Sequence, residues 1–124
     1  MDFAHVGFAV RDLQRSKEFY AKALAPVGIV LTKEKEDSIH FGRDGRTILW
    51  IHTRGPVPGP IHIAFEADTR TQVQEFYNAA IAAGGKDNGT PSIRENYSPN
   101  YYAAFVIDPD GHNIEAVCRT QTVL

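Results

Sequence analysis

The hydrophobic residues of this chain fall into short alternating runs, typical of strands, and two longer runs with helical spacing. The short runs are rich in aromatic and β-branched residues and are bounded by glycine, proline and acidic residues. The polar stretch from 86 to 100 is expected to form either an irregular strand with loops or a mobile flap. We expect strands at about residues 3–10, 28–35, 38–42, 46–53, 61–67, 101–107 and 112–118.

Two segments place their apolar residues on one side of a helix. The first is expected over about residues 12–25, where Asp12 can cap the helix and a proline and a glycine follow its end. The second is expected over about residues 69–83, where Thr69 and Gln72 have the spacing of a capping box. Each helix therefore follows a strand and precedes a run of further strands.

The chain repeats itself. The sequence HVGF at 5–8 recurs as HIAF at 62–65, and EFY at 18–20 recurs at 75–77, each pair being separated by 57 positions. A shared offset between separated landmarks indicates two copies of one βαβββ module.

We expect a single α+β domain over residues 1–124, because each half is too small to bury its apolar surface alone. Module one is expected at about 1–54 and module two at about 61–124. The proline- and glycine-rich segment 55–60 is the linker, and it falls where the repeat restarts.

Composition narrows the function classes. With 13 Lys and Arg residues against 15 Asp and Glu residues, and no basic run, nucleic acid is not an expected partner. The single cysteine excludes an internal disulfide and a paired-cysteine metal motif. Membrane-spanning and signal-peptide patterns are missing, so we expect a cytoplasmic protein with no membrane partner.

Strand alternation turns two histidines and one glutamate toward the same side of the expected sheet. His5 lies on the opposite face from Val6 and Phe8, and His62 holds the equivalent place in the second module. In the last strand Glu115 points away from its apolar neighbours. Two histidines and one carboxylate are the ligands of non-haem iron oxygenases and of some catalytic zinc sites. One such residue in a strand is ordinary, but the repeat equivalence of the histidines favours a metal site.

The βαβββ repeat, the opening HVGF, the EFY of each helix and the closing DPDGHNIEA together resemble the vicinal oxygen chelate superfamily. It includes glyoxalase, bleomycin- and fosfomycin-resistance proteins, methylmalonyl-CoA epimerase and type I extradiol dioxygenases. The resemblance covers essentially the whole chain. It implies two modules in a half-open, cup-shaped barrel, often in a homodimer, with metal ligands on the first and last strand of each module. His5, His62 and Glu115 match three of these positions, and they imply a divalent ion: iron, manganese, zinc or nickel.

The fourth ligand position of the family departs from the pattern in this chain. Aligning the turns of the two modules places Leu49 there, and a slip of one residue places Trp50 there; neither can bind a metal ion. The departure disfavours glyoxalase and the epimerase, and favours extradiol-dioxygenase-like chemistry on a small substrate that chelates the metal through adjacent oxygens. The fosfomycin-resistance enzymes carry a threonine and a tyrosine where this chain has Gly7 and Phe105, and this difference disfavours that activity. The alternatives are a glyoxalase-like lyase or isomerase, and a non-catalytic binding protein of the bleomycin-resistance type.

Four residues are candidates for contacts with a small-molecule substrate. Trp50 could form an aromatic wall, although ordinary sheet packing explains it as well. Arg94 could hold an anionic group, and Tyr101, which shares its face with Phe105, could reach inward as an acid or a hydrogen-bond donor. Two histidines are left without an assigned role, and either could serve as an acid–base group: His40 and His52.

Overall fold

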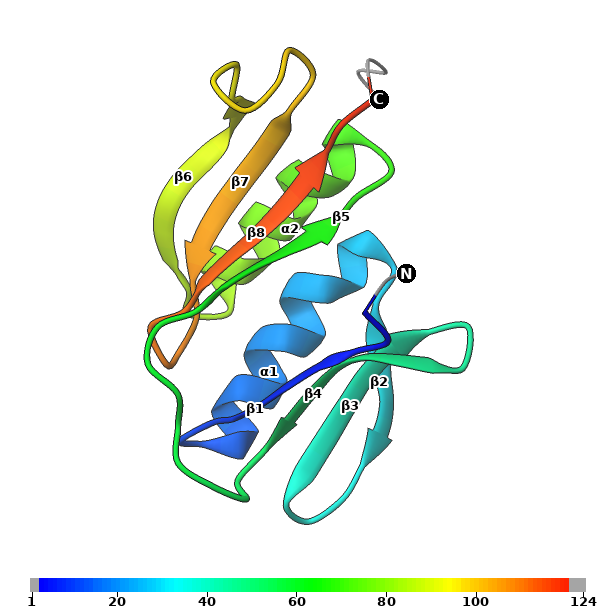
Figure 1. The fold of residues 1–124 in the computed structure, drawn as a ribbon, viewed down its shortest axis with the longest axis vertical. Helices are drawn as coiled ribbons and strands as arrows, with labels where there is room; N and C mark the ends of the chain where they lie inside the picture. Colours follow the sequence, from blue (N-terminus) through cyan, green and yellow to red (C-terminus); the bar gives the residue numbers. More distant parts are fainter. Residues whose placement is uncertain (1–2, 121–124) are drawn as a thin grey trace.

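The computed structural model describes residues 3–120, which form two βαβββ modules, each a four-stranded mixed sheet with one helix packed against it (Figure 1). Module one contains β1 (Val6–Ala9), α1 (Leu13–Leu24), the short 3-10 helix η1 (Ala25–Val27), β2 (Val30–Glu34), β3 (Ser38–Arg43) and β4 (Arg46–His52). Module two contains β5 (His62–Glu66), α2 (Arg70–Ala82), β6 (Lys86–Ile93), β7 (Tyr102–Ile107) and β8 (Asn113–Cys118). The repeated α+β architecture predicted from the sequence is confirmed.

The two sheets have the same strand order. It is β1-β4-β3-β2 in module one and β5-β8-β7-β6 in module two, with β1–β4 and β5–β8 parallel and the other pairs antiparallel. β1 and β5 are therefore edge strands, and within residues 3–120 no ladder joins one sheet to the other. The sheets do not close into one barrel. Both helices lie behind the sheets in the view of Figure 1 and contact each other, which leaves the opposite face of each sheet uncovered by helix.

Both helices begin at the predicted caps. The Asp12 carboxylate accepts a hydrogen bond from the backbone N–H of Arg15 at 3.1 Å, and α1 starts at the next residue. Thr69 and Gln72 form the complete capping box at the start of α2. Gly28 ends η1 with a φ of 81°, a left-handed conformation that favours glycine.

The two modules share one core, as the size of each module predicts. The core contains fully buried side chains of both modules, among them Phe19, Leu49, Phe76 and Ile114. Cys118 is a buried free thiol in the same core.

Two segments differ in detail from the strands expected from the sequence. The first strand is shorter than expected, since β1 covers Val6–Ala9 only. The polar stretch after α2 forms β6, whose ladder with β7 contains two register shifts, and then a loop from 94 to 101. Of the two interpretations of this stretch, the irregular strand with a loop is the one found.

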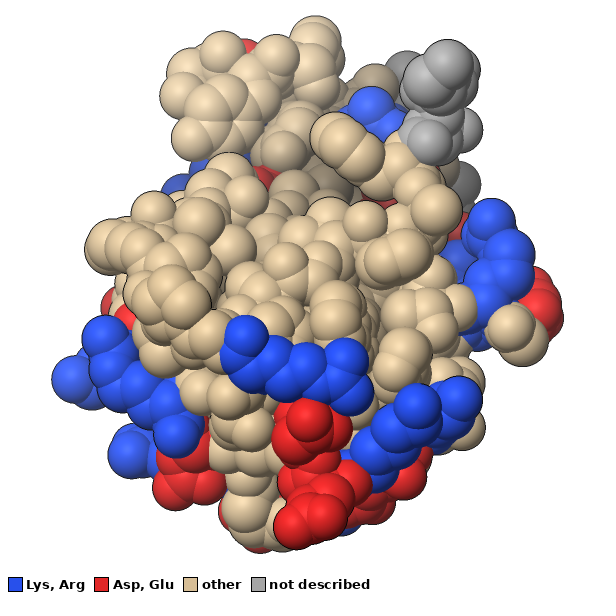
Figure 2. Space-filling model, turned by 60° about the horizontal axis from the view of Figure 1, so that its bottom comes forward, with Lys and Arg blue, Asp and Glu red and all other residues tan. Residues whose placement is uncertain are grey.

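Charged residues are mixed on the face shown in Figure 2, where Lys and Arg side chains lie next to Asp and Glu around a broad uncharged region. This distribution agrees with the balanced charge of the sequence. Within residues 3–120, neither helix is long and apolar enough to cross a membrane.

Candidate metal and substrate site

His62 and Glu115 form a close pair on adjacent strands. β5 and β8 are parallel neighbours in which Ala64 is opposite Glu115. His62 Nε2 lies 2.9 Å from Glu115 Oε1. The Glu115 side chain is only 2% exposed, whereas that of His62 is 49% exposed. The carboxylate is thus held at the base of the sheet face, with the imidazole between it and solvent.

The hydrogen bond on the other side of the His62 ring determines what this pair can hold. His62 Nδ1 lies 2.9 Å from the backbone oxygen of Asn113, and a carbonyl oxygen only accepts, so Nδ1 carries the hydrogen. In the neutral ring, Nε2 therefore presents its lone pair toward a carboxylate oxygen. Two acceptors at this separation require a cation between them, either a proton or a metal ion. Metal-ligating histidines are commonly oriented by such a bond to a backbone carbonyl, so this pair fits a divalent ion.

Tyr101 and Phe105 complete the surroundings of the carboxylate. Tyr101 Oη donates a hydrogen bond of 2.5 Å to Glu115 Oε2, and Phe105 lies opposite Glu115 across the β7–β8 ladder. The Phe105 ring stacks against His62 with 6.2 Å between centroids. Burial first, and then the hydrogen bond to Glu115, raise the pKa of Tyr101 well above its usual value. Tyr101 therefore keeps its proton and acts as a donor on this face, where alternation with Phe105 predicted it.

Arg94 lies over the same sheet face. Its guanidinium carbon is 5.1 Å from the centroid of the Phe105 ring, and its Nη2 donates to the backbone oxygen of Thr90 at 2.6 Å. Gly89 leaves room for this placement, because a Cβ there would lie 2.9 Å from Arg94 Nη2. A cavity of about 290 Å³ lies here, lined by Asn88, Arg94, Asn96, Tyr97, Phe105 and Asn113.

The third predicted ligand, His5, lies apart from this pair. His5 is exposed just before β1 and lines a cavity of about 320 Å³ that is formed only by module-one residues. No group of three His, Cys, Asp or Glu side chains within residues 3–120 is arranged to hold a metal ion. The chain thus brings together His62 and Glu115 and keeps His5 on the other module.

The strand register decides between the two residues considered for the fourth ligand position. Gly7 is opposite Trp50 in module one, just as Ala64 is opposite Glu115 in module two. Since Gly7 and Ala64 are repeat equivalents, Trp50 holds the position of Glu115, and Leu49 is fully buried in the core. The Trp50 ring lies directly over Gly7, where a Cβ would be 2.7 Å from Trp50 Cε3. Trp50 is therefore on the non-helix face of its sheet, in the same cavity as His5.

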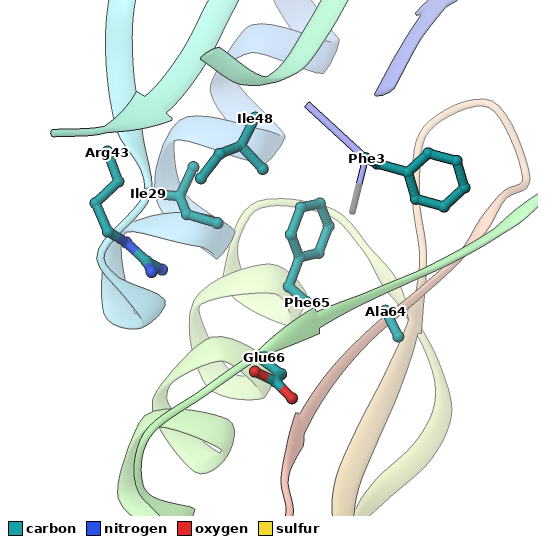
Figure 3. A pocket seen from close by; sticks show the side chains of 7 residues that line it. All are labelled: Phe3, Ile29, Arg43, Ile48, Ala64, Phe65 and Glu66. Carbon is teal, nitrogen blue, oxygen red and sulfur yellow. The ribbon is translucent and has the colours of Figure 1, made fainter. Parts of the chain in front are cut away.

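Some residues around these cavities were not predicted from the sequence. Strand alternation places Ser38 on the face of His40, so the pattern contained a signal for it. Arg54 lies beyond the last strand of module one, where no periodicity applies. Lys35 falls in the strand expected at 28–35, but β2 ends at Glu34 and its ladder shifts register between Leu31 and Lys33, which breaks the alternation. A further cavity of about 610 Å³ is lined by residues of both modules, including Phe3, which is 92% exposed (Figure 3). It is lined by Phe3, Ile29, Arg43, Ile48, Ala64, Phe65 and Glu66.

Comparison with protein families finds one match over most of the chain. The model of the "Glyoxalase/Bleomycin resistance protein/Dioxygenase superfamily" matches residues 2–116. The comparison with curated proteins finds no relative.

Several solved structures have the same fold. A glyoxalase/bleomycin resistance protein from Albidiferax ferrireducens is 30% identical, with a TM-score of 0.81 over 95% of this chain and 98% of that one. A glyoxalase/bleomycin resistance protein/dioxygenase family enzyme from Burkholderia phytofirmans is 17% identical, with a TM-score of 0.74 over 97% and 100% of the two chains. Lactoylglutathione lyase from Agrobacterium tumefaciens is 19% identical, with a TM-score of 0.67 over 94% and 92%. At 17% and 19% identity the last two show similarity of fold alone.

Proposed function

Because the chain belongs to the glyoxalase/bleomycin resistance protein/dioxygenase superfamily, we propose that it is an enzyme that uses a divalent metal ion held by His5, His62 and Glu115. The ion is iron, manganese, zinc or nickel, and the substrate is a small molecule that chelates it through two adjacent oxygens. The observation that carries the proposal is the His62–Glu115 pair, in which Nδ1 of the ring is occupied by a backbone carbonyl and Nε2 faces the carboxylate. Nitrogen and oxygen donors of this kind suit these ions.

A second copy of the chain is the proposed source of the third ligand. His5 and His62 lie at the edge strands of two separate sheets, and each is exposed on its own module. Edge strands present unpaired backbone groups, and pairing with another chain satisfies them. In a homodimer that sets module one of one copy against module two of the other, His5 would join the partner copy's ligand pair. Each dimer would then contain two equivalent sites.

The residues of the chain have distinct roles in this proposal. Glu115 supplies a desolvated carboxylate whose second oxygen is held by Tyr101. Phe105 packs beside one side of the His62 ring and offers an aromatic surface, and Trp50 offers another on module one. When bound, the ion would supply Lewis-acid polarisation of the substrate oxygens.

The position of Trp50 supports one reaction class over the others. It holds the place where glyoxalase-like relatives are expected to supply a fourth protein ligand, so three protein ligands are available and more positions stay open for substrate. This arrangement favours extradiol-dioxygenase-like chemistry, in which a catecholate chelates the metal, over a glyoxalase-like lyase or isomerase.

Metal content tests the proposal. Elemental mass spectrometry on protein purified without an affinity tag is expected to find about one equivalent of iron, manganese, zinc or nickel per chain, and His62→Ala is expected to lose it. Oxygen consumption with a catechol then separates dioxygenase from lyase chemistry. Protein that takes up none of these ions after reconstitution contradicts the enzyme proposal and favours a metal-free binding protein of the bleomycin-resistance type.

A further inference from the structure

The module-one cavity differs in charge from the module-two face. Its lining contains two cationic residues, two histidines, two hydroxyl residues and the single tryptophan of the chain, and no carboxylate. Arg54 is held from outside by Asp37, with Nε 2.8 Å from Oδ2. In the described part of the chain, Lys35 takes part in none of the salt bridges. The lining residues are His5, Lys35, Ser38, His40, Thr47, Trp50 and Arg54.

Within residues 3–120, two polar groups of this cavity have no hydrogen-bond partner. Ser38 is 1% exposed, and its Oγ has no hydrogen-bond partner among residues 3–120. Trp50 Nε1 is also buried and unpaired within the same range. Ser38 lies on the face of its strand opposite Ile39, which is in the core, so its side chain is turned to the cavity. Buried polar groups usually have a partner, which can be a water or a ligand, so both groups are available to a molecule that enters the cavity.

Cationic side chains surround His40 in the cavity, and the neighbouring carboxylate, Asp37, is paired with Arg54 and also interacts with Lys35. Burial is the main cause that lowers the pKa of His40, and neighbouring cations act in the same direction. His40 Nδ1 is 3.0 Å from Thr47 Oγ1, which ties the ring to the cavity wall. The cations that disfavour a further positive charge here are Lys33, Lys35, His5 and Arg54.

We propose that this cavity binds an anionic oxygen group, a carboxylate or a phosphoryl group, that is part of the substrate. Lys35 provides the charge, and Ser38 Oγ and Trp50 Nε1 provide donors that the protein leaves unused. The inference rests on the proposed function, because it assigns a charged group to the substrate of the same site. His5 lines the same cavity, so the anionic group would lie on the module-one side of the metal ligand set.

The single tryptophan makes the cavity directly observable. Trp50 is the one indole of the chain, so fluorescence excited at a wavelength that the five tyrosines do not absorb reports on this cavity alone. Protein dialysed free of metal is titrated with inorganic phosphate and, separately, with acetate, at constant ionic strength. Without metal, neither anion can act through a bound ion.

Three variants accompany the wild type. Lys35→Gln removes the unpaired cation, and Ser38→Ala removes the buried hydroxyl. Lys22→Gln is the matched control, because Lys22 is an exposed lysine on α1, which covers the other side of the fold. Far-ultraviolet circular dichroism verifies that each variant is folded.

The expected result is a saturable change in Trp50 fluorescence, from which the affinity for the anion is obtained. Lys35→Gln is expected to weaken this affinity by about fivefold, as loss of one close charge at a partly solvated site predicts. Ser38→Ala is expected to weaken the affinity as well, and Lys22→Gln to leave it unchanged. Tighter binding of phosphate assigns a phosphoryl group, and tighter binding of acetate assigns a carboxylate. A change that does not saturate with either anion, or equal affinities in Lys35→Gln and Lys22→Gln, overturns the inference. Because the titration is metal-free, it can succeed where metal binding fails, which separates the two proposals.

Discussion

Tyr101 and Glu115 are joined by a hydrogen bond of 2.5 Å from Tyr101 Oη to Glu115 Oε2, while Oε1 of the same carboxylate faces His62. The buried carboxylate therefore has a partner at each oxygen. Tyr101, which keeps its proton, donates to one oxygen, and His62, the other proposed ligand, faces the second. Tyr101 acts as a positioning residue in this arrangement, since it fixes the orientation of Glu115.

Replacing Tyr101 by phenylalanine is expected to weaken metal binding by about tenfold, because groups that orient a ligand typically contribute on this scale. Competition with a coloured chelator measures the dissociation constant. Tyr97→Phe is the control, because Tyr97 is 59% exposed and contacts Tyr101 only through its ring, with 5.0 Å between centroids. Equal affinities in the two variants would show that Tyr101 does not position Glu115.

Gly7 allows the Trp50 ring to lie over β1. Gly7→Ala would place a Cβ 2.7 Å from Trp50 Cε3, so the ring must move, at a cost of about 1–3 kcal/mol. The free energy of unfolding measured in urea is expected to fall, and the emission maximum of the single tryptophan is expected to shift with it. Gly55→Ala is the control, since a Cβ at Gly55 meets nothing within 4 Å. An unchanged emission spectrum in Gly7→Ala contradicts the placement of Trp50.

Tyr20 links the two modules through a hydrogen bond from its hydroxyl to the Asp108 carboxylate, and both side chains are buried. Burial and the neighbouring carboxylate raise the pKa of Tyr20 well above its usual value, so the hydroxyl remains a donor. Tyr20→Phe leaves Asp108 Oδ2 without this partner and is expected to lower the free energy of unfolding by about 1–3 kcal/mol. In urea denaturation, Tyr102→Phe should change stability much less, because the Tyr102 hydroxyl accepts an exposed hydrogen bond from Gln74 Nε2, and the ring is kept. A Tyr20→Phe variant as stable as wild type contradicts this account of the module interface.

The lowered pKa of His40 predicts that the protein becomes less stable as the pH falls. The pKa of His40 in the folded state lies below the usual value of a histidine, chiefly because of burial, so the unfolded chain binds a proton more readily. The stability that His40 contributes is complete above the unfolded pKa and is lost as the pH falls through the lowered folded pKa. The free energy of unfolding between pH 7.5 and 5 is expected to fall less steeply in His40→Gln than in wild type. Identical slopes would mean that His40 titrates alike in both states.

The sequence predicted the features that depend on local patterns, namely the strand faces, the repeat and the helix caps. The alternation of apolar and polar positions placed Glu115 and Tyr101 on one face of the second sheet, and the offset of 57 positions identified both modules. The caps at Asp12 and Thr69 have local signatures, and both helices begin there.

What the sequence could not predict depends on how separate elements meet. Whether His5 approaches His62 is decided by the packing of one module against the other, in which the two helices contact each other. A single slip in register separates Leu49 from Trp50, and only the ladder with β1 resolves it. Lys35 is expected at the end of a strand, but β2 ends one residue before it and shifts register between Leu31 and Lys33, so alternation does not give the direction of its side chain.

The central proposal is a metal site shared by His5 of one copy and by His62 and Glu115 of another. Mixed dimers test it most directly. His5→Ala and His62→Ala chains, each expected to bind no metal alone, are unfolded together, refolded and reconstituted with Fe(II) or Zn(II). The mixed dimer contains one complete site, formed by His5 of the His62→Ala chain and by His62 and Glu115 of the His5→Ala chain. The account predicts one metal ion per mixed dimer by elemental mass spectrometry after separation from the homodimers. A mixed dimer with no metal, beside wild-type protein that binds one ion per chain, contradicts the shared site and assigns all ligands to a single chain.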